Sequence, residues 1–356
     1  MGNNFKILKR FFCLFIILGQ LVTLTSCLKT LPEENNNKPL QAVYFNYFDT
    51  VSNIFTYAGD GQEKFAENCG EISALLNEYH QLFDIYHEYS GINNLCTINK
   101  NAGKEAIVVD QKLIDFLKYA KEIHTLTNGE TNIMLGSVLV LWHNERENAS
   151  LNPTNAKIPD IEALEEARLH TDINLLEIDD EKNTVRIADE KARIDVGALG
   201  KGYATEKAAQ LMESKGVTSY VLNIGGNIRI IGTKTDGSGW ITGIRDPFSS
   251  GYAMYMNLSD TSCVTSGDYE RFFTVDGVKY HHIIDKDTLM PAEYFSSITV
   301  ITKDSGLADA LTTALFTMSY EEGRALVDSI DGVDVLWISK DGSQVYTDGI
   351  VPVERN

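Results

Sequence analysis

The sequence predicts an α+β fold with mixed or largely antiparallel sheets and flanking helices. Most strand-like segments follow one another in pairs that are joined by short polar turns, as in hairpins. The few helical segments do not alternate regularly with single strands, as they would in a doubly wound parallel sheet. The chain has 356 residues, which is enough to bury a substantial core in one large domain or two smaller ones.

The N-terminal residues predict an export signal. Basic residues at positions 6, 9 and 10 precede an almost wholly apolar run over 11–24, which is too short for a comfortable membrane span. The run ends in Leu24-Thr25-Ser26-Cys27, which resembles the lipobox of bacterial lipoproteins, where the cysteine is diacylated and becomes the first residue. The alternative is an ordinary secreted protein in which Cys27 occurs by chance. We therefore expect a signal peptide over 1–26, a lipidated Cys27 with a flexible tether over 27–41, and one folded domain over 42–352.

Charge and cysteine content exclude two classes of protein. Loss of the signal peptide removes three positive charges and no negative ones, so the formal net charge changes from −19 to −22. Nucleic acid is therefore not an expected partner, because phosphate binding needs clustered Lys and Arg. The cysteines of the folded domain, Cys69, Cys96 and Cys263, have neither the number for a full disulfide framework nor the spacing of a zinc site. We expect them to be small buried apolar residues.

Helices are predicted where apolar residues recur every three or four positions. Residues 69–89 show this most clearly, with apolar side chains at positions 72, 75, 76, 79, 82 and 83. The helix over 203–215 follows a glycine-rich stretch and stops at Gly216, a typical helix-ending residue. The other predicted helices cover residues 112–125, 161–169, 308–319 and 321–330.

Strands are predicted from short apolar or alternating runs that are bounded by turn residues. A strand pair over 42–58 opens the folded domain, and a second pair over 175–178 and 184–187 is joined by Asp-Asp-Glu-Lys-Asn. Further strands are predicted over 221–224, 228–231, 240–244, 254–258, 272–275 and 297–302.

The glycine-rich stretch Asp-Val-Gly-Ala-Leu-Gly-Lys-Gly over 195–202 could bring backbone amides close to an anionic ligand. The helix that follows would add free N–H groups and the positive end of its dipole, and Lys201 would add a cation. Glycines are also common in turns that precede a helix. The stretch matches neither of the phosphate-binding motifs G-x-x-x-x-G-K-[ST] and G-x-G-x-x-G. Taken alone, the stretch favours a structural role.

Asp309 and Thr313 lie four residues apart within an apolar helical segment and therefore share one helix face. A carboxylate and a hydroxyl on one face can bind a hard cation if carbonyl and substrate oxygens complete the shell. As an isolated pattern, however, an N-cap aspartate and a threonine bonded to the preceding turn explain the pair better.

The stretch over 262–291 carries more chemically capable polar side chains than a core segment would, which favours a functional site. It contains a Ser-Gly-Asp turn, the adjacent His281 and His282, and Asp285 three residues after the second histidine. Two isolated histidines elsewhere, His143 and His170, are more typical of surface or core positions than of a metal site.

Together these segments resemble the ApbE family of FAD:protein FMN transferases, in the same order and at similar spacing. The resemblance spans about residues 43–335. The weaker matches are FDT at 48–50, Phe83-x-x-Tyr86 and TNGETNIMLGSVLVLWH at 127–143. The main matches are DVGALGKGYATEKA at 195–208, VLNIGGNIRIIG at 221–232, WITGIRDP at 240–247, VTSGDYERFF at 264–273, YHHIID at 280–285 and LADALTTALF at 307–316.

The resemblance implies transfer of FMN from FAD to a Thr or Ser hydroxyl of a partner protein, with formation of a phosphoester and release of AMP. His282, held near Asp285, is the candidate base for the incoming hydroxyl, and His281 is expected to be structural or exposed. The resemblance implies a Mg²⁺ site formed by Asp309, Thr313, the carbonyl of Ala198 and Thr312. It implies FAD contacts from Asp195 and Lys201, from Phe48 and Tyr86 beside the flavin or adenine, and from Asn132, Ile133, Met134 and Ile283.

The chain departs from the family pattern at four positions outside the implied metal site, and at one of them Phe48 stands where the family usually has methionine. Lys286 and Leu289 replace a proline and a glycine in the loop after His282, so we expect that turn to have a different backbone shape. Gly91 stands where the family has a glutamate, next to Ser90. These changes affect the flavin loop more than the metal site, whose residues all remain.

Two other functions remain open: a Mg²⁺-dependent FAD pyrophosphatase, in which water replaces the protein hydroxyl, and a flavin-binding lipoprotein without turnover. The chain has no good copy of the Asp-x-Ser/Thr-Gly-Ala-Thr signature that the family modifies, so we expect a separate acceptor protein that bears it. Acceptors in the family include membrane redox-pump subunits and extracytoplasmic flavoproteins. They agree with a lipid-anchored enzyme on the extracytoplasmic face of the cell membrane.

Overall fold

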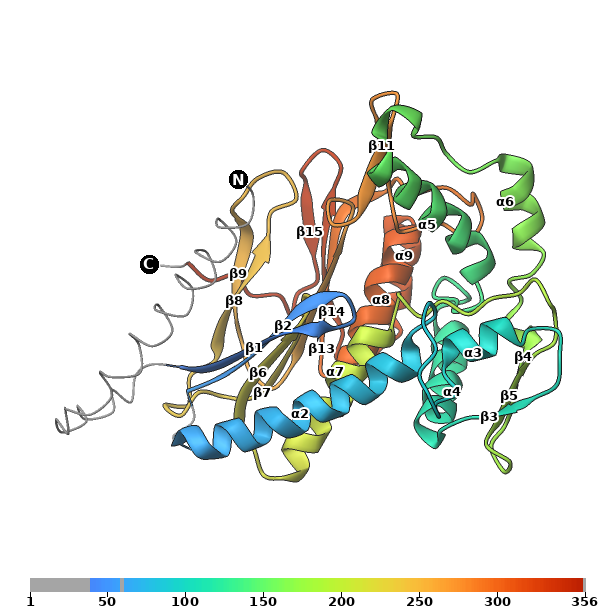
Figure 1. Cartoon of the computed structure of the whole chain (residues 1–356). Coiled ribbons are helices and arrows are strands. Elements are labelled where there is room, and N and C mark those ends of the chain that lie inside the picture. Colours follow the sequence, from blue (N-terminus) through green and yellow to red (C-terminus); the bar gives the residue numbers. More distant parts are fainter. Residues whose placement is uncertain (1–38, 58–60, 355–356) are drawn as a thin grey trace, which may run out of the picture. The chain divides into compact units, whose positions relative to one another are not determined.

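An eight-stranded sheet forms the centre of the computed structural model, which describes residues 39–57 and 61–354 (Figure 1). The expected signal peptide and Cys27 lie outside these residues. Neighbouring strands of the sheet are antiparallel throughout, which confirms the predicted α+β class with largely antiparallel strands. In spatial order the strands are β1 (Leu40–Tyr47), β2 (Thr50–Thr56), β6 (Ser219–Ile224), β7 (Asn227–Gly232), β10 (Ser262–Gly267), β13 (Phe295–Thr302), β14 (Asp334–Ser339) and β15 (Gln344–Tyr346).

Smaller antiparallel sheets and several helices surround this sheet. The small sheets are β3 (Ile107–Val108) with β5 (Thr184–Ile187) and β4 (Leu176–Asp179), the hairpin β8 (Trp240–Arg245) with β9 (Tyr252–Leu258), and the hairpin β11 (Phe272–Val275) with β12 (Val278–His281). The helices are α2 (Gly61–Phe83), α3 (Leu95–Lys100), α4 (Gln111–Leu126), α5 (Gly136–Leu151), α6 (Ile161–Arg168), α7 (Gly200–Ser214), α8 (Ser305–Thr317) and α9 (Tyr320–Asp328). Among the described residues, none of these helices has the length and hydropathy needed to cross a membrane.

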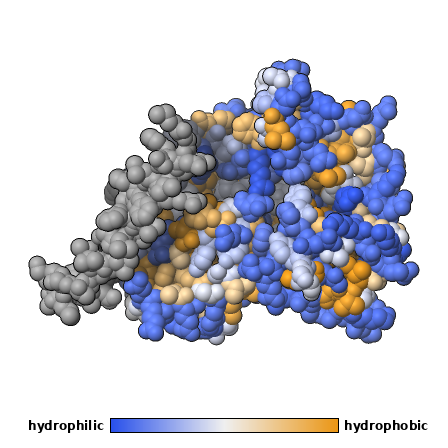
Figure 2. Space-filling model, in the orientation of Figure 1, coloured by the Kyte–Doolittle hydropathy of each residue, from blue (hydrophilic) through white to orange (hydrophobic). Residues whose placement is uncertain are grey.

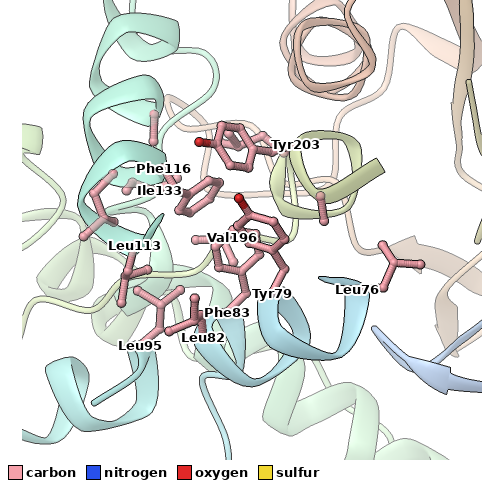
Figure 3. Close-up of a cluster of buried hydrophobic side chains, with 14 of the residues drawn as sticks. Leu76, Tyr79, Leu82, Phe83, Leu95, Leu113, Phe116, Ile133, Val196 and Tyr203 are labelled. Atoms are coloured by element: carbon pink, nitrogen blue, oxygen red, sulfur yellow. The ribbon is translucent and has the colours of Figure 1, made fainter. Parts of the chain in front are cut away.

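Apolar helix faces cover one side of the central sheet. The largest core cluster joins the stripe of α2 at every third or fourth residue to α4, α7 and the inward side chains of β6. Figure 3 shows part of this cluster, where Tyr79 and Phe83 of α2 lie beside Phe116 of α4 and Tyr203 of α7. Helices α8 and α9 form a second cluster with β13 and β14. The helices are therefore fixed against the sheet by buried side chains.

The hairpin β8–β9 covers the opposite side of the sheet. Trp240 packs against Val221 of β6 and Ile230 of β7, which are register partners. Met254 and Met256 of β9 pack with residues of β10 and β14. Because these central strands are covered on both sides, nearly every residue of β6 and β13 is buried, including the serines of β13. Cys69, Cys96 and Cys263 are free and buried, as predicted.

The structure corrects the extent of two predicted helices. Helix α2 ends at Phe83 and not near Tyr89, because the Asp84 carboxylate accepts the backbone N–H groups of Tyr86 and His87 at 2.7 and 2.9 Å. Such a local side-chain bond replaces a further helical turn. Helix α7 begins at Gly200, three residues earlier than predicted. The sequence analysis missed α3, α5, β3, β10, β12, β14 and β15.

The contact between α7 and α8 depends on a missing side chain. A Cβ at Gly202 would overlap the Ser305 carbonyl oxygen and the Asp309 Cβ. Because Gly202 has none, its N–H reaches the Asp309 carboxylate at 2.8 Å. Gly202 therefore lets the first turns of the two helices touch, which is a structural role within the glycine-rich stretch.

The turn after His282 has a backbone shape that suits glycine, although leucine stands there. Leu289 has a φ of 61°, in the left-handed region that glycine adopts most easily. Its side chain is buried with Trp142, and its carbonyl accepts the Trp142 Nε1–H at 2.9 Å. This burial offsets a backbone cost of roughly 1–3 kcal/mol.

We predict that Gly202→Ala lowers the free energy of unfolding by about 2 kcal/mol or more, because the added methyl group overpacks the contact between α7 and α8. The matched control is Gly70→Ala in α2, where a Cβ meets no atom within 4 Å. That control should raise stability by up to about 1 kcal/mol. Chemical denaturation followed by circular dichroism measures both, and equal effects of the two substitutions would contradict this account.

Candidate functional site

A cavity of about 1070 Å³ lies beside the starts of α7 and α8. Its walls come from the β1–β2 turn, the segment after α2, helix α5, the glycine-rich stretch, the β6–β7 turn and the loop after β12. The cavity is large enough for a dinucleotide-sized ligand, since smaller ligand pockets span roughly 300–1,000 Å³. The predicted site residues that line it are Phe48, Tyr86, Asn132, Asp195, Ala198, Lys201, His282, Ile283, Asp309 and Thr313. Ile133, Met134, Asp285 and Thr312 are predicted site residues that do not line it.

Asp309 is a buried carboxylate in the cavity wall. Its Oδ2 accepts the Gly202 N–H at 2.8 Å, and its Oδ1 lies 3.9 Å from the Lys201 Nζ. Burial raises its pKa, while Lys201, the Gly202 N–H and the Asn227 side chain act in the opposite direction. A buried carboxylate of this kind gains by binding a cation.

Two neutral oxygens lie with Asp309 in the cavity wall. Thr313 follows it by one helical turn and lines the same cavity. In a continuous helix the Gly202 N–H would bond to the Ala198 carbonyl, but here it bonds to Asp309 instead. The Ala198 carbonyl does not receive that bond, so it can serve another partner.

These residues fit a magnesium ion that is shared with a phosphate ligand. Among the described residues, no group of three or more His, Cys, Asp or Glu side chains is placed to hold a metal ion. Mg²⁺ in such sites is usually bound by one or two carboxylates, with waters and substrate phosphates completing its octahedron. Asp309, Thr313 and the Ala198 carbonyl are the kind of partial ligand set that the protein supplies in such sites.

The structure corrects the expectation that Thr312 belongs to the metal site. Its side chain is fully buried between α8 and β10. The Thr312 hydroxyl donates to the Asp309 carbonyl at 2.7 Å and accepts a hydrogen bond from the Ser266 hydroxyl at 2.9 Å. Thr312 therefore stabilises the position of α8, and Thr313 is the threonine that faces the cavity.

His282 lines the cavity with one nitrogen free to act as a base. Its Nδ1 and its backbone N–H both lie against the Arg271 carbonyl oxygen, at 3.2 and 3.1 Å. Since a carbonyl oxygen only accepts hydrogen bonds, Nδ1 carries the proton and Nε2 keeps its lone pair. Burial, and then the charge of Arg271, lowers the pKa of His282 to about 3, so the ring is neutral near pH 7.

Asp285 does not hold His282, contrary to the prediction. The Asp285 Oδ1 accepts the backbone N–H groups of Asp287 and Thr288 at 2.7 and 2.9 Å. Asp285 is thus the first residue of a tight turn, and the carbonyl of Arg271 orients the imidazole of His282 in its place.

Residues 132–134 hold the cavity wall in place through their backbone and through core packing. Ile133 and Met134 are core side chains, which corrects the expectation that they contact the flavin. The Ile133 carbonyl accepts the Asp195 N–H at 2.8 Å. The Asn132 side chain bonds to the Met134 N–H and to the Thr171 carbonyl. This segment therefore fixes Asp195 in the cavity wall.

Phe48 enters the cavity from a strained turn. Phe48 and Asp49 have φ values of 54° and 52° in the two-residue turn between β1 and β2. Turns of this type favour Asn-Gly, and strain of this kind is typical of ligand-contacting positions. The Phe48 N–H donates to the His80 Nδ1 at 3.3 Å, and the two rings meet edge to face.

Comparison with known proteins agrees with this geometry. The model of the ApbE family matches residues 48–337. The chain belongs to the ApbE family. This match covers all the predicted catalytic, cofactor-binding and metal-binding residues, including Phe48 at its start and Asp309 near its end, and it does not cover Cys27.

The relatives of this ApbE chain are transferases by name. An FAD:protein FMN transferase from Treponema pallidum (strain Nichols) is 33% identical over 297 residues, which cover 79% of each chain. One from Vibrio cholerae serotype O1 is 28% identical over 93% of this chain and 95% of its own. The crystal structure of the ApbE protein from Thermotoga maritima has a TM-score of 0.77 and 30% identity, over 87% of this chain and 97% of its own. The flavin transferase ApbE from Vibrio cholerae has a TM-score of 0.72 and 27% identity over the same shares.

The cavity of this ApbE chain also contains residues that the sequence analysis did not select. His143 and Arg146 lie on α5, and the Arg146 guanidinium donates to the His143 Nδ1 at 2.9 Å. The His143 ring stacks near Tyr86, with centroids 5.2 Å apart. The spacing of three residues between His143 and Arg146 would have placed them on one helix face, if α5 had been recognised.

Arg146 and Arg271 lie with Asp195 in the cavity wall. Burial raises the pKa of Asp195, while the Gly197 N–H, and then His143, Arg146 and Arg271, act against that rise. The Asp195 Oδ1 accepts the Gly197 N–H at 2.9 Å. A carboxylate and two guanidinium groups in one wall can bind a ligand that has both polar donors and phosphate oxygens.

His281 has a structural role, which is one of the two outcomes expected from the sequence, structural or exposed. The ring is buried, its Nε2–H donates to the Ala292 carbonyl at 2.8 Å, and its Nδ1 accepts the Ile283 N–H at 3.3 Å. A second proton would break the bond to Ile283. Burial accordingly lowers the pKa of His281 to about 4 from its usual 6.5.

We predict that His281 makes the fold acid-sensitive. Between pH 6.5 and about 4 the unfolded imidazole binds a proton that the folded one does not. Stability should therefore fall with decreasing pH in this window, by up to about 1.4 kcal/mol per pH unit from this group. His281→Gln keeps a neutral donor near Ala292 and should flatten the slope. Urea denaturation at several pH values measures it, and identical slopes in both proteins would contradict the assignment.

Proposed function

We propose that this chain is a Mg²⁺-dependent FAD:protein FMN transferase. It moves FMN from FAD to a Thr or Ser hydroxyl of an acceptor protein, forms a phosphoester and releases AMP. The observation that carries the proposal is the meeting of Asp309, Thr313 and the Ala198 carbonyl with Lys201 in one cavity. A family model that matches residues 48–337 and relatives named for this activity support the same assignment.

The residues of the cavity divide between the two ends of FAD. Phe48 and Tyr86 offer aromatic rings on one wall, where a flavin or adenine ring can stack. Lys201 lies in the first turn of α7, where the helix N-terminus favours negative charge. Asp309 and Thr313 lie in the second and third turns of α8, and the Gly202 N–H holds the Asp309 carboxylate against the first turn of α7. The pyrophosphate would therefore lie between the start of α7 and these two residues of α8.

The chemistry requires one bond to form and one to break. The acceptor hydroxyl oxygen attacks the phosphorus of the FMN half of FAD, and the bond from that phosphorus to the bridging oxygen breaks. The bridging oxygen leaves with the electron pair as part of AMP. The hydroxyl proton moves to His282 Nε2, which is unprotonated and faces the cavity.

Asp309, Thr313 and the Ala198 carbonyl would hold the magnesium ion. The ion supplies charge neutralisation and orientation of the pyrophosphate. Lys201, at 3.9 Å from Asp309, adds a second positive charge for the same phosphates. Arg271 orients His282 through its carbonyl, while its side chain lines the cavity.

The acceptor is a separate protein that bears an Asp-x-Ser/Thr-Gly-Ala-Thr signature, for example a membrane redox-pump subunit. Lipid attachment at Cys27 would hold the enzyme on the extracytoplasmic face of the membrane, beside such acceptors. The sequence around Cys27 and the polar tether that follows support this location.

We predict that Asp309→Asn abolishes Mg²⁺-dependent AMP release and leaves the fold intact. Thr313→Val should raise the Mg²⁺ concentration for half-maximal AMP release at least about tenfold, because a ligand of the ion is lost. Thr312→Val is the matched control, and it should lower thermal stability and leave the Mg²⁺ requirement unchanged. Equal Mg²⁺ requirements in the two threonine variants would contradict the assignment of Thr313.

The transfer itself is tested with residues 28–356, FAD, Mg²⁺ and a carrier protein that displays the acceptor signature. AMP together with an FMN mass increment on the carrier supports the transferase. AMP with free FMN and an unmodified carrier would make the chain an FAD pyrophosphatase. FAD binding without AMP would leave a flavin-binding lipoprotein.

We predict that Cys27→Ser prevents lipid labelling and releases the protein from the membrane fraction. The expected physical reason is the loss of two acyl chains, which anchor a protein stably where one chain does not. Cys13→Ser, inside the expected signal peptide, is the control and should still be labelled. Radiolabelled palmitate and cell fractionation measure both, and unchanged labelling of Cys27→Ser would refute the anchor.

A further inference from the structure

A second, smaller hollow of about 300 Å³ lies between β8 and the face of the central sheet. We call it the aromatic groove, and it is lined chiefly by Phe55, Trp240, Ile241, Tyr252 and Tyr255. Ile241 and Tyr252 are 50% and 54% exposed, so this apolar surface is open to solvent. Figure 2 shows that hydrophilic residues cover much of the visible face and that apolar residues form smaller patches between them.

One edge of β8 borders the aromatic groove and is unpaired. Within the described residues β8 pairs with β9 alone, and the outer edge of β9 meets Pro352. An unpaired strand edge presents a row of backbone N–H and C=O groups to any extended peptide beside it. Such an edge with adjacent side-chain hollows is the arrangement that binds peptides by strand addition.

Trp240 supplies a further unsatisfied donor. Its Nε1–H is buried and has no hydrogen-bond partner among the described residues. Buried donors nearly always have a partner, because an unpaired one costs roughly 1–3 kcal/mol.

The aromatic groove is continuous with the large cavity. Asn223, Ile228 and Gly243 line both. A polypeptide segment in the groove would therefore lead directly toward the metal-site cavity. A reactive hydroxyl on that segment can reach the cavity where the chain that carries it crosses this shared boundary.

We propose that the aromatic groove binds the extended segment of the acceptor protein that flanks the modified hydroxyl. The segment adds as a strand to the free edge of β8, places an apolar side chain among Phe55, Trp240 and Tyr252, and directs its hydroxyl across Gly243 into the cavity. This inference rests on the proposed transferase function. It names the surface that would bind a protein acceptor and so favour FMN transfer to that protein over hydrolysis of FAD by water.

The test compares Ile241→Asp and Tyr252→Asp with the wild type. Both residues lie outside the lining of the large cavity and are exposed, so the fold and FAD binding should be unaffected. We expect the KM for the carrier protein with the acceptor signature to rise at least about tenfold, which corresponds to about 1.4 kcal/mol. The KM for FAD and the AMP release without carrier should stay within about twofold.

Val108→Asp is the matched control. Val108 lies on β3, is 62% exposed and borders neither the groove nor the cavity. This control introduces the same negative charge on an exposed strand, and it should leave the KM for the carrier unchanged. An equal rise in all three variants would mean that charge repels the carrier without a defined site, and would overturn the proposal.

The outcomes separate the groove from the proposed function. Normal transfer by both groove variants, with an unchanged KM for the carrier, would overturn the groove and leave the transferase intact. A wild type that releases AMP and free FMN but never modifies the carrier would refute the transferase, and the groove proposal with it. If the groove instead joined two copies of this chain, the variants would lower the mass in solution without changing the KM for the carrier.

Discussion

Asp309 reaches the first turn of α7 because Gly202 leaves no side chain between the two helices. This contact brings a buried carboxylate to the N-terminus of a helix, next to Lys201. A second bond fixes the same junction, since the Glu206 carboxylate of α7 accepts the Ser305 N–H at the start of α8 at 3.0 Å. The site therefore depends on how closely two helices approach, and less on any single ligand.

A buried charge network ties this junction to the central sheet. Arg229 of β7 is fully buried and donates to Glu206 at 3.2 Å and to Glu213 at 2.7 Å. Removal of one partner from such a network is strongly destabilising, because the remaining charge is left buried. The network thus holds α7 on the sheet while Glu206 also holds α8. The positions of α7 and α8, which this network fixes, determine the shape of the cavity.

Much of the fold could be predicted from the sequence, because apolar spacing and turn residues report local structure directly. Most helices and the hairpins β1–β2, β4–β5, β6–β7 and β8–β9 follow from these patterns, and the glycines at the start of α7 mark a real close approach. Helix α5 was missed because its apolar residues run contiguously over 138–142 and its second half is polar. His143 and Arg146 were missed with it, although they line the cavity.

The finer details of the site depend on tertiary contacts that a sequence does not state. Spacing alone cannot tell that Thr312 bonds to Ser266 and Thr313 faces the cavity. Nor can it tell that the Arg271 carbonyl orients His282 in place of Asp285. Leu289 shows the same limit, because its burial beside Trp142 supports a backbone shape that its residue type disfavours.

The most direct test of the central claim is a crystal structure of residues 28–356 with FAD and Mn²⁺, using the anomalous signal of the metal. The account predicts one metal peak within coordination distance of the Asp309 carboxylate, the Thr313 hydroxyl and the Ala198 carbonyl, with phosphate oxygens of FAD completing its shell. A metal bound elsewhere in the cavity, or a pyrophosphate remote from the start of α7 and from Asp309, would contradict it.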